Sequence, residues 1–304
     1  MSMGASNLAP SFATLFGAKL IDHKKAVIWF TVFILLGAVL AGQNVAKTLG
    51  EKIIPSGHIT FDVVLVILLA AVSGLIIANL LRVPESTSWT TVFALSGVGL
   101  ALGRIEIATL WRIIPFWIIL PVLGFAITYF LYKIIYPPRL NNLWLYQHIF
   151  NKDKNLKTLA FASSCYIAFA AGTNNVANAV GPLAGAGLID PILGLAVVAL
   201  LFGAGGLFIG KRIMKTLGEE IVPLGLISSS LVGVVTATLL LFASLMGIPQ
   251  SLVQLSALSV MAIGVVKHER HIFNEKATRR IFLTWSITPI ISFSVGFFLT
   301  KVFL

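Results

Sequence analysis

Charged side chains are scarce in this sequence. They make up 11% of its 304 residues, whereas a soluble domain carries about 25%. Hydrophobic residues make up 58% and form long runs, and a run of about 20 apolar residues crosses a bilayer. The net charge of +11 comes from the stretches between these runs. We therefore expect it to set membrane topology, and we do not expect nucleic acid as a partner.

Cysteine and metal-binding clusters are also lacking. The one cysteine, Cys165, excludes an intrachain disulfide. The five histidines lie between the apolar runs or at their ends and do not have the spacing of metal ligands. No nucleophile stands beside a general base within the apolar runs. The sequence therefore predicts neither an enzyme nor a metal or cofactor site, and the lipid bilayer is the first partner that it predicts.

The sequence contains a long internal repeat. The nonapeptide Lys47–Pro55 recurs as Lys215–Pro223, and aligning Gly4–Pro55 with Gly172–Pro223 without a gap gives 18 identities in 52 positions. From Val83 onward the offset between the copies changes from 168 to 165. A repeat of this length is typical of secondary transporters, which place their substrate sites at the repeat interface.

Ten apolar segments follow one another, five in each copy of the repeat. A polar connector, residues 136–157, separates a first repeat of residues 1–135 from a second of residues 158–304. These features predict an all-α polytopic membrane protein. The expected segments are a short run ending at Ile21, then Val27–Ala46, Phe61–Leu81, Ser86–Leu102, Ile113–Ile135, Thr158–Ile189, Ile192–Gly210, Ile221–Met246, Ser251–Val266 and Ile281–Leu304.

The first segment is shorter than its counterpart. Only Met1–Met3 precede Gly4, whereas Thr158–Ala171 precede Gly172 in the second repeat. By the arithmetic of the repeat, a half-span on the order of 15 residues is missing from the first helix. We expect a truncated or misplaced start as the reason, and a defective first copy is the alternative.

An odd number of crossings in each repeat inverts the second copy relative to the first. If all ten segments cross the membrane, 17 of the lysines and arginines lie on one side and 5 on the other. The richer side should be cytoplasmic. This places the basic connector inside the plasma membrane and both termini outside. The alternative is that the fourth and ninth segments are re-entrant hairpins, which would move the connector outside.

The sixth segment is interrupted by the polar stretch Gly172–Asn178. Polar side chains in hydrocarbon must face protein, water or a ligand. We expect a helix break at Gly172 and a new half-helix capped by Asn175 or Asn178. In the first repeat, Pro10 replaces the counterpart of Asn178 and fits the first turn of a helix. Such a half-helix start offers N–H groups and a positive dipole end to an anion. The alternative is that these polar residues only hold helices together.

A second pair of polar helix starts opens the fourth and ninth segments. Pro84–Thr91 carries a proline, a glutamate and several hydroxyls, and its partner is Pro249–Gln254. The hydroxyls could donate to the oxygens of an anion. The alternative is ordinary N-capping at the membrane surface.

These motifs resemble those of a known family. Gly172–Gly181 resembles the Gly-Ala-Asn-Asp-x-Ala-Asn signature of the inorganic phosphate transporter (PiT) family, and Pro84–Ser88 resembles its Pro-Val-Ser-Thr-Thr motif. The run Asn174–Leu183, the Ser-Thr-Ser helix start and Pro249–Gln254 are most similar to the CysP-type sulfate permease branch. The resemblance implies an ion-coupled anion transporter with an inverted repeat and a central site between broken helices. The substrate-binding residues that it implies are Asn7, Ser86, Thr87, Ser88, Asn174, Asn175, Asn178, Ser251 and Gln254.

The sequence departs from the family pattern at three places. The aspartate that helps bind sodium in phosphate members is Asn7 in one half and Asn175 in the other, which argues against sodium as the coupling ion. Sulfate carries no proton at neutral pH, so an amide that donates suits it better than a carboxylate. Leu252 and Val253 replace a threonine pair, so the site is expected to be asymmetric. The third departure is Pro10 in place of an asparagine.

The predicted function is therefore import of inorganic sulfate across the plasma membrane by secondary active transport. Protons are the favoured coupling ion over sodium, and Glu85 and Glu106 are the candidate coupling residues, with an interfacial position as the alternative for each. Phosphate transport coupled to sodium or protons is the alternative function, and an anion channel is a further one. Thiosulfate is a third oxyanion that the motifs allow, and a homodimer is compatible with the sequence.

Overall fold

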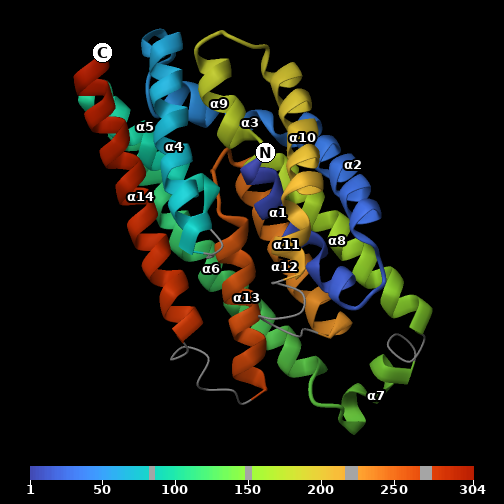
Figure 1. Cartoon of the computed structure of the whole chain (residues 1–304). Helices are drawn as coiled ribbons and strands as arrows, with labels where there is room; N and C mark the ends of the chain where they lie inside the picture. Colours follow the sequence, from blue (N-terminus) through green and yellow to red (C-terminus); the bar gives the residue numbers. More distant parts are fainter. Residues whose placement is uncertain (82–85, 148–152, 216–224, 268–275) are drawn as a thin grey trace.

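The described part of the chain is helical throughout (Figure 1). The computed structural model describes residues 1–81, 86–147, 153–215, 225–267 and 276–304. The first half contains α1 (Ser2–Gly17), α2 (His23–Ala41), α3 (Gln43–Lys47), a π-helical turn (Thr48–Lys52), a 3-10 turn (Ser56–His58), α4 (Phe61–Leu81), α5 (Thr87–Ala101) and α6 (Ile107–Ile135). The second contains a 3-10 turn (Leu140–Asn142), α7 (Leu143–Leu145), α8 (Asp153–Asn175), α9 (Ala177–Gly185), α10 (Pro191–Phe208), α11 (Gly210–Lys215), α12 (Leu226–Leu245), α13 (Leu252–Val266) and α14 (Lys276–Phe303).

Several helices are long and apolar enough to cross a membrane. Within the described ranges there are five: α2, α6, α10, α12 and the part of α14 from Phe282 onward. Their outer faces expose large apolar side chains, such as Leu36, Ile118 and Leu200. Exposed apolar faces on helices of this length suit contact with lipid. The helices therefore fit a multi-pass membrane protein, as the composition predicts.

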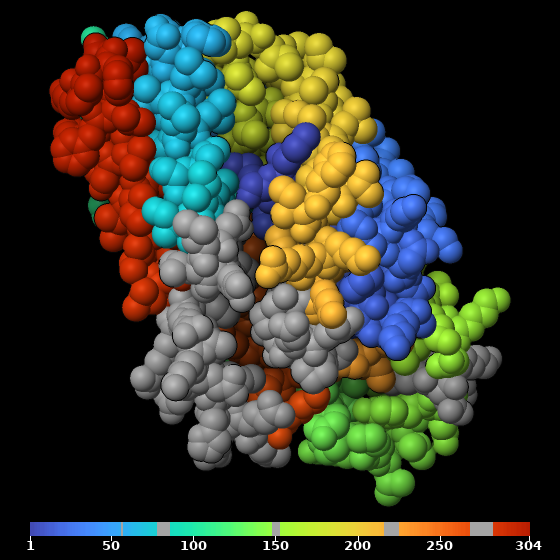
Figure 2. All heavy atoms as spheres, in the orientation of Figure 1, coloured from blue at the N-terminus to red at the C-terminus, as the bar shows by residue number. Residues whose placement is uncertain are grey.

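Helices of one half pack against helices of the other. α2 lies along α8, and α10 lies along α1. In the same way, α14 packs on α5 while α6 packs on α13. Figure 1 shows α4, α5 and α14 together on one side and α2, α8 and α10 on the other. In the space-filling view, the start of α1 lies recessed between α4 and α10 (Figure 2). The two halves of the described chain are therefore packed together through several helix pairs.

The break in the sixth segment lies at a different residue from the predicted one. α8 runs through Gly172 to Asn175, and α9 begins after Val176, which has no side-chain cap. Gly172 serves a close approach instead, because a Cβ added there would lie 2.1 Å from the backbone oxygen of Ile34 in α2. Neither Asn175 nor Asn178 caps α9, since both side chains bond to other helices.

Pro10 also departs from its expected place. It lies inside α1, which is continuous from Ser2 to Gly17, and so does not open a half-helix. The hydroxyl of Ser11 donates to the backbone oxygen of Asn7 at 2.9 Å, and this bond links the residues before and after Pro10 within the helix. The first repeat therefore lacks the break that the second repeat has at Val176.

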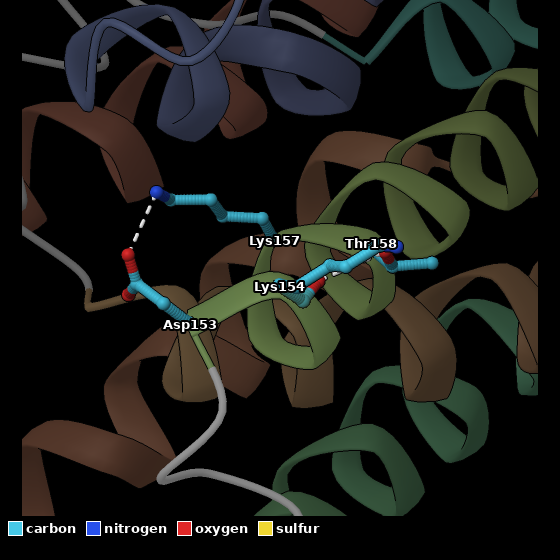
Figure 3. A network of polar contacts seen from close by, with 4 residues as sticks. All are labelled: Asp153, Lys154, Lys157 and Thr158. Atoms are coloured by element: carbon cyan, nitrogen blue, oxygen red, sulfur yellow. Dashed lines mark hydrogen bonds and ion pairs between the residues drawn. The ribbon is translucent and has the colours of Figure 1, made fainter.

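The start of α8 marks the end of the polar connector. Lys157 Nζ lies 2.8 Å from Asp153 Oδ2, and the Thr158 hydroxyl donates to the backbone oxygen of Lys154 at 2.9 Å (Figure 3). An acidic residue four positions before a basic one suits the first turn of a helix, because it also complements the helix dipole. The charged side chains are exposed, and the apolar part of α8 follows them.

Candidate functional site

Two helices of equal length begin at the centre of the molecule with the same cap. α5 and α13 each contain 15 residues. Ser86 Oγ accepts from Trp89 N at 3.2 Å, and Ser251 Oγ accepts from Gln254 N at 3.2 Å. Both serines have extended backbone angles and are buried. The serines thus cap these helices, as the alternative interpretation of the motifs held, but at buried positions inside the protein.

The two helix starts touch each other. The Ser88 hydroxyl donates to the backbone oxygen of Gln250 at 3.0 Å. Trp117 of α6 donates from Nε1 to the backbone oxygen of Pro249 at 2.7 Å, and its ring stacks on Trp89 with 4.8 Å between centroids. The positive ends of two helix dipoles therefore meet in a region that other helices shield from solvent.

Asn174 holds the segment that leads into α13. Its Nδ2 donates to Ser244 Oγ at 2.9 Å and to the backbone oxygen of Ile248 at 3.0 Å, and its Oδ1 accepts from Gln250 N at 2.9 Å. Both the Nδ2 group and Oδ1 of Asn174 bond to other groups of the protein. Asn174 therefore positions the helix start, a role that its substrate-binding assignment from sequence did not include.

Asn178 links α9 to the start of α5. Its Nδ2 donates to Thr87 Oγ1 at 3.1 Å and to Ser88 Oγ at 3.2 Å. Because the Ser88 hydroxyl donates its hydrogen to the backbone oxygen of Gln250, its oxygen must accept from Asn178 Nδ2. This fixes the orientation of the Asn178 amide. Asn178 Oδ1 is buried and has no hydrogen-bond partner in the described ranges.

Asn7 and Asn175 form a direct contact between the two halves. Asn175 Nδ2 donates to Asn7 Oδ1, and Asn7 Nδ2 donates to the backbone oxygen of Met3 at 2.6 Å. The Met3 carbonyl can only accept, so it orients Asn7, and Asn7 then orients Asn175. This leaves Asn175 Oδ1 buried without a hydrogen-bond partner among the described residues.

The sequence analysis missed Gln250. This residue is fully buried, and neither its Oε1 nor its Nε2 has a hydrogen-bond partner among the residues that the structure describes. Its backbone is held on both sides, at N by Asn174 and at O by Ser88. A buried amide without partners normally needs a ligand or water. The signal in the sequence is a glutamine directly before the Ser251 cap, within a motif that was otherwise noted.

The predicted site residues do not all lie in this cluster. Glu106 is exposed at the start of α6, where its backbone N donates to Ile53 O at 2.9 Å, so the structure does not bring it to the buried amides. Glu85 lies outside the described residues. All nine predicted substrate-binding residues are buried, namely Asn7, Ser86, Thr87, Ser88, Asn174, Asn175, Asn178, Ser251 and Gln254.

The cluster is polar but carries no ionised side chain. Among the described residues, the buried polar set consists of Asn, Gln, Ser and Thr, and a search of the same ranges finds no group of acidic, histidine and cysteine side chains that could hold a metal. The helix starts supply positive potential and N–H donors, and the hydroxyls and amides supply more donors. Such an arrangement can replace the hydration shell of a small anion.

Comparison with known proteins agrees with this geometry. The chain matches the phosphate transporter family over residues 3–296. Sulfate permease CysP of Bacillus subtilis (strain 168) is 34% identical over 309 residues, covering 100% of this chain and 85% of that protein. A candidate phosphate permease of Thermococcus kodakarensis is 25% identical over 383 residues, covering 99% and 94%.

A solved structure has the same fold. The sodium-dependent phosphate transporter superimposes with a TM-score of 0.84 at 22% sequence identity, and the match covers 100% of this chain and 96% of that one. Its fold, the family match over residues 3–296 and the buried polar helix starts agree with one another. The chain therefore belongs to the phosphate transporter family, and its function class is that of a permease and not of an enzyme.

Proposed function

We propose that this protein is a secondary active transporter that imports inorganic sulfate across the plasma membrane. The observation that carries the proposal is the meeting of the α5 and α13 starts, with Asn178 and Ser88 between them. Two dipole ends in a shielded region favour a dianion. The relative at 34% identity, which is named a sulfate permease, supports this choice of oxyanion.

The neutral amides favour an anion without a proton. Asn7 and Asn175 occupy the positions at which phosphate members of the family carry aspartate, and they bond to each other. Donors remain for the anion: Gln250 Nε2 and the first N–H groups of two helices. A carboxylate at either position would repel a dianion, whereas an amide adds no charge.

The contacts between halves support an inverted repeat with the site on its axis. A Cβ added at Gly4 would lie 2.2 Å from Phe202 O, and one added at Gly172 would lie 2.1 Å from Ile34 O. These two contacts are equivalent, because both residue pairs are related by the offset of 168. Asn7 and Asn175 are also 168 residues apart. Residues that touch their own equivalents lie at the interface of the repeats, where such transporters bind substrate.

The orientation follows from the distribution of charge. The proposal places the basic connector in the cytoplasm and both chain ends outside. Protons remain the proposed coupling ion, because the positions of the sodium-binding aspartates hold Asn7 and Asn175. Four amide oxygens, on Asn175, Asn178, Gln250 and Gln254, have no partner among the described residues, so they can accept hydrogen bonds from a protonated group or water during the cycle.

The test is uptake by the purified protein in liposomes. We expect saturable uptake of labelled sulfate that a proton gradient drives and a sodium gradient does not, with weak competition by phosphate. Phosphate uptake of equal efficiency would establish the alternative function, which the name of the Thermococcus relative favours. A flux that does not saturate would identify a channel.

The site itself is tested by one pair of variants. Asn175→Ala removes the amide pair with Asn7 and is expected to abolish sulfate uptake while the protein still reaches the membrane. Asn44→Ala is the matched control, because Asn44 is an exposed asparagine that donates to Leu245 O at 3.0 Å. Unchanged uptake by Asn175→Ala would remove the pair from the site.

A further inference from the structure

Three buried hydroxyls, Thr128 of α6, Thr236 of α12 and Ser259 of α13, have no hydrogen-bond partner within the part of the chain that the structure describes. We call them the hydroxyl seam. A threonine or serine in a helix usually donates to the backbone oxygen one turn earlier. Thr238 and Ser244 do so on α12 itself, at 2.8 Å each. The seam hydroxyls make no such bond, so they can form hydrogen bonds with water or a ligand.

The seam residues lie where α6, α12 and α13 meet. A Cβ added at Gly124 of α6 would lie 3.2 Å from Ser259 Oγ and 3.3 Å from the side chain of Leu239 of α12. Thr128 is one turn beyond Gly124, and Thr236 is one turn before Leu239, so both share these faces. The three hydroxyls thus come from three helices to one junction.

The junction lies between the central site and a pocket at the other end of α13. Ser251, Ser259 and Lys267 stand at the start, the middle and the end of that helix. One turn beyond Thr128, the Tyr132 hydroxyl accepts from Ser228 Oγ at 3.3 Å. Tyr132, Ser228 and Lys267 all line a pocket of about 540 Å³.

The pocket is suited to an anion. Lys267 brings a positive charge, and Gly225, which also lines the pocket, opens α12 without a side-chain cap. The first N–H groups of this 20-residue helix therefore have no capping side chain. The charge of Lys267, the dipole of α12 and the hydroxyl groups thus all favour an anion in the pocket at this end of the seam.

The other half of the repeat has no such hydroxyls at the equivalent positions. The offset of 165 relates Thr236 and Ser259 to Ala71 and Ala94, and the offset of 168 relates Thr128 to Gly296. The latter register is supported by identical residues at 117 and 285, 121 and 289, and 125 and 293. A Cβ added at Gly296 would lie 2.9 Å from Ala94 O, so this junction is tightly packed. Ser292 of α14 and Thr91 of α5 are buried without a hydrogen-bond partner among the described residues, but the positions equivalent to the seam carry only carbon or hydrogen.

We infer that the hydroxyl seam is the route by which the transported oxyanion passes between the central site and the pocket at Lys267. The seam is closed in this structure and opens when α6, α12 and α13 separate during transport. Its hydroxyls replace water around the anion as it moves, while the junction of Ala71, Ala94 and Gly296 stays sealed. The inference rests on the proposed function, and it adds a path to it.

Thiol accessibility tests the route. In a chain with Cys165→Ala, which removes the native cysteine, we compare Ser259→Cys with its repeat equivalent Ala94→Cys. Lys267→Cys serves as the positive control at the pocket. A small anionic methanethiosulfonate reagent, which carries a sulfonate group, is added to protein in liposomes, and modification is followed by mass. We expect Ser259→Cys to react about tenfold faster than Ala94→Cys or more, because reaction requires a thiolate in contact with water. Sulfate at saturating concentration should slow it.

The outcomes separate the route from the function. Equal labelling of the two cysteines, or faster labelling of Ala94→Cys, overturns the route while leaving sulfate uptake untouched. If wild-type protein takes up no sulfate, the proposed function fails, and the labelling contrast still decides the route without substrate. Should Ser259→Cys fail to fold, as judged by its elution, Thr236→Cys and Ala71→Cys replace the pair with the same expectation.

Discussion

Substitution of Asn174 tests its proposed structural role, because its side-chain amide bonds to other groups of the protein. The substitution Asn174→Ala removes three hydrogen bonds, to Ser244 Oγ, Ile248 O and Gln250 N, all at 2.9–3.0 Å and all buried. Hydrogen bonds between membrane helices contribute about 0.6 kcal/mol each on average, so the three bonds give about 2 kcal/mol. Leaving the N–H of Gln250 and the carbonyl of Ile248 unpaired adds about 1–3 kcal/mol for an orphaned group.

We therefore expect Asn174→Ala to lower the free energy of unfolding by about 3 kcal/mol or more, from about 2 kcal/mol for the lost bonds and about 1 kcal/mol or more for the orphaned groups. The measurement is reversible unfolding in mixed micelles, with sulfate uptake recorded on the same preparation. Asn44→Ala is the control, because it removes one exposed bond and should change stability by about 0.5 kcal/mol or less. A variant as stable as the wild type that has nevertheless lost uptake would refute the reasoning, since Asn174 would then serve the substrate directly.

The remaining predictions concern packing, capping and the support of the site. Gly172→Ala should lower the melting temperature, because its Cβ would meet a backbone oxygen of α2 at 2.1 Å, whereas Gly57→Ala, with open space around it, should not. The backbone N–H of Lys25 donates to the Asp22 carboxylate and lowers the pKa of Asp22. This cap therefore stabilises α2 above the pKa that Asp22 has in the unfolded chain, and the stabilisation is lost as the pH falls through the lower pKa of the folded state. Circular dichroism at acid pH should show this dependence, and Asp22→Asn should not show it. Trp117→Phe loses the bond to Pro249 O, so we expect slower sulfate uptake at normal expression, and unchanged kinetics would contradict a positioning role.

The helices were largely predictable, because their signals are local. Phe61–Leu81 has the predicted bounds, and the helix predicted over Ser86–Leu102 is α5, which begins after its Ser86 cap. Asp22 and Asp190 cap equivalent helices, as their repeated sequence context would lead one to expect. Length, hydropathy and capping chemistry act within a few residues, so sequence reports them directly.

The predicted position of the helix break is wrong because a glycine in a membrane helix can either interrupt the helix or allow a close approach of a neighbouring helix. The sequence predicts the break at Gly172, but this glycine lies at a close approach of α2 and α8, and the helix is interrupted four residues later at Val176. Which meaning applies depends on the neighbouring helix, which a single sequence does not reveal.

The sequence by itself determined that this is a helical membrane protein built from a repeat, and which polar residues lie deep within it, because composition and periodicity follow from burial in lipid. Only the tertiary structure decided what each amide does. It bonds the Asn174 side chain to the segment before α13 and pairs Asn7 with Asn175. It leaves the Gln250 side chain without a hydrogen-bond partner in the described part of the chain. These roles depend on the direction and partners of each side chain, and those are set by helices that are more than 70 residues apart in the sequence.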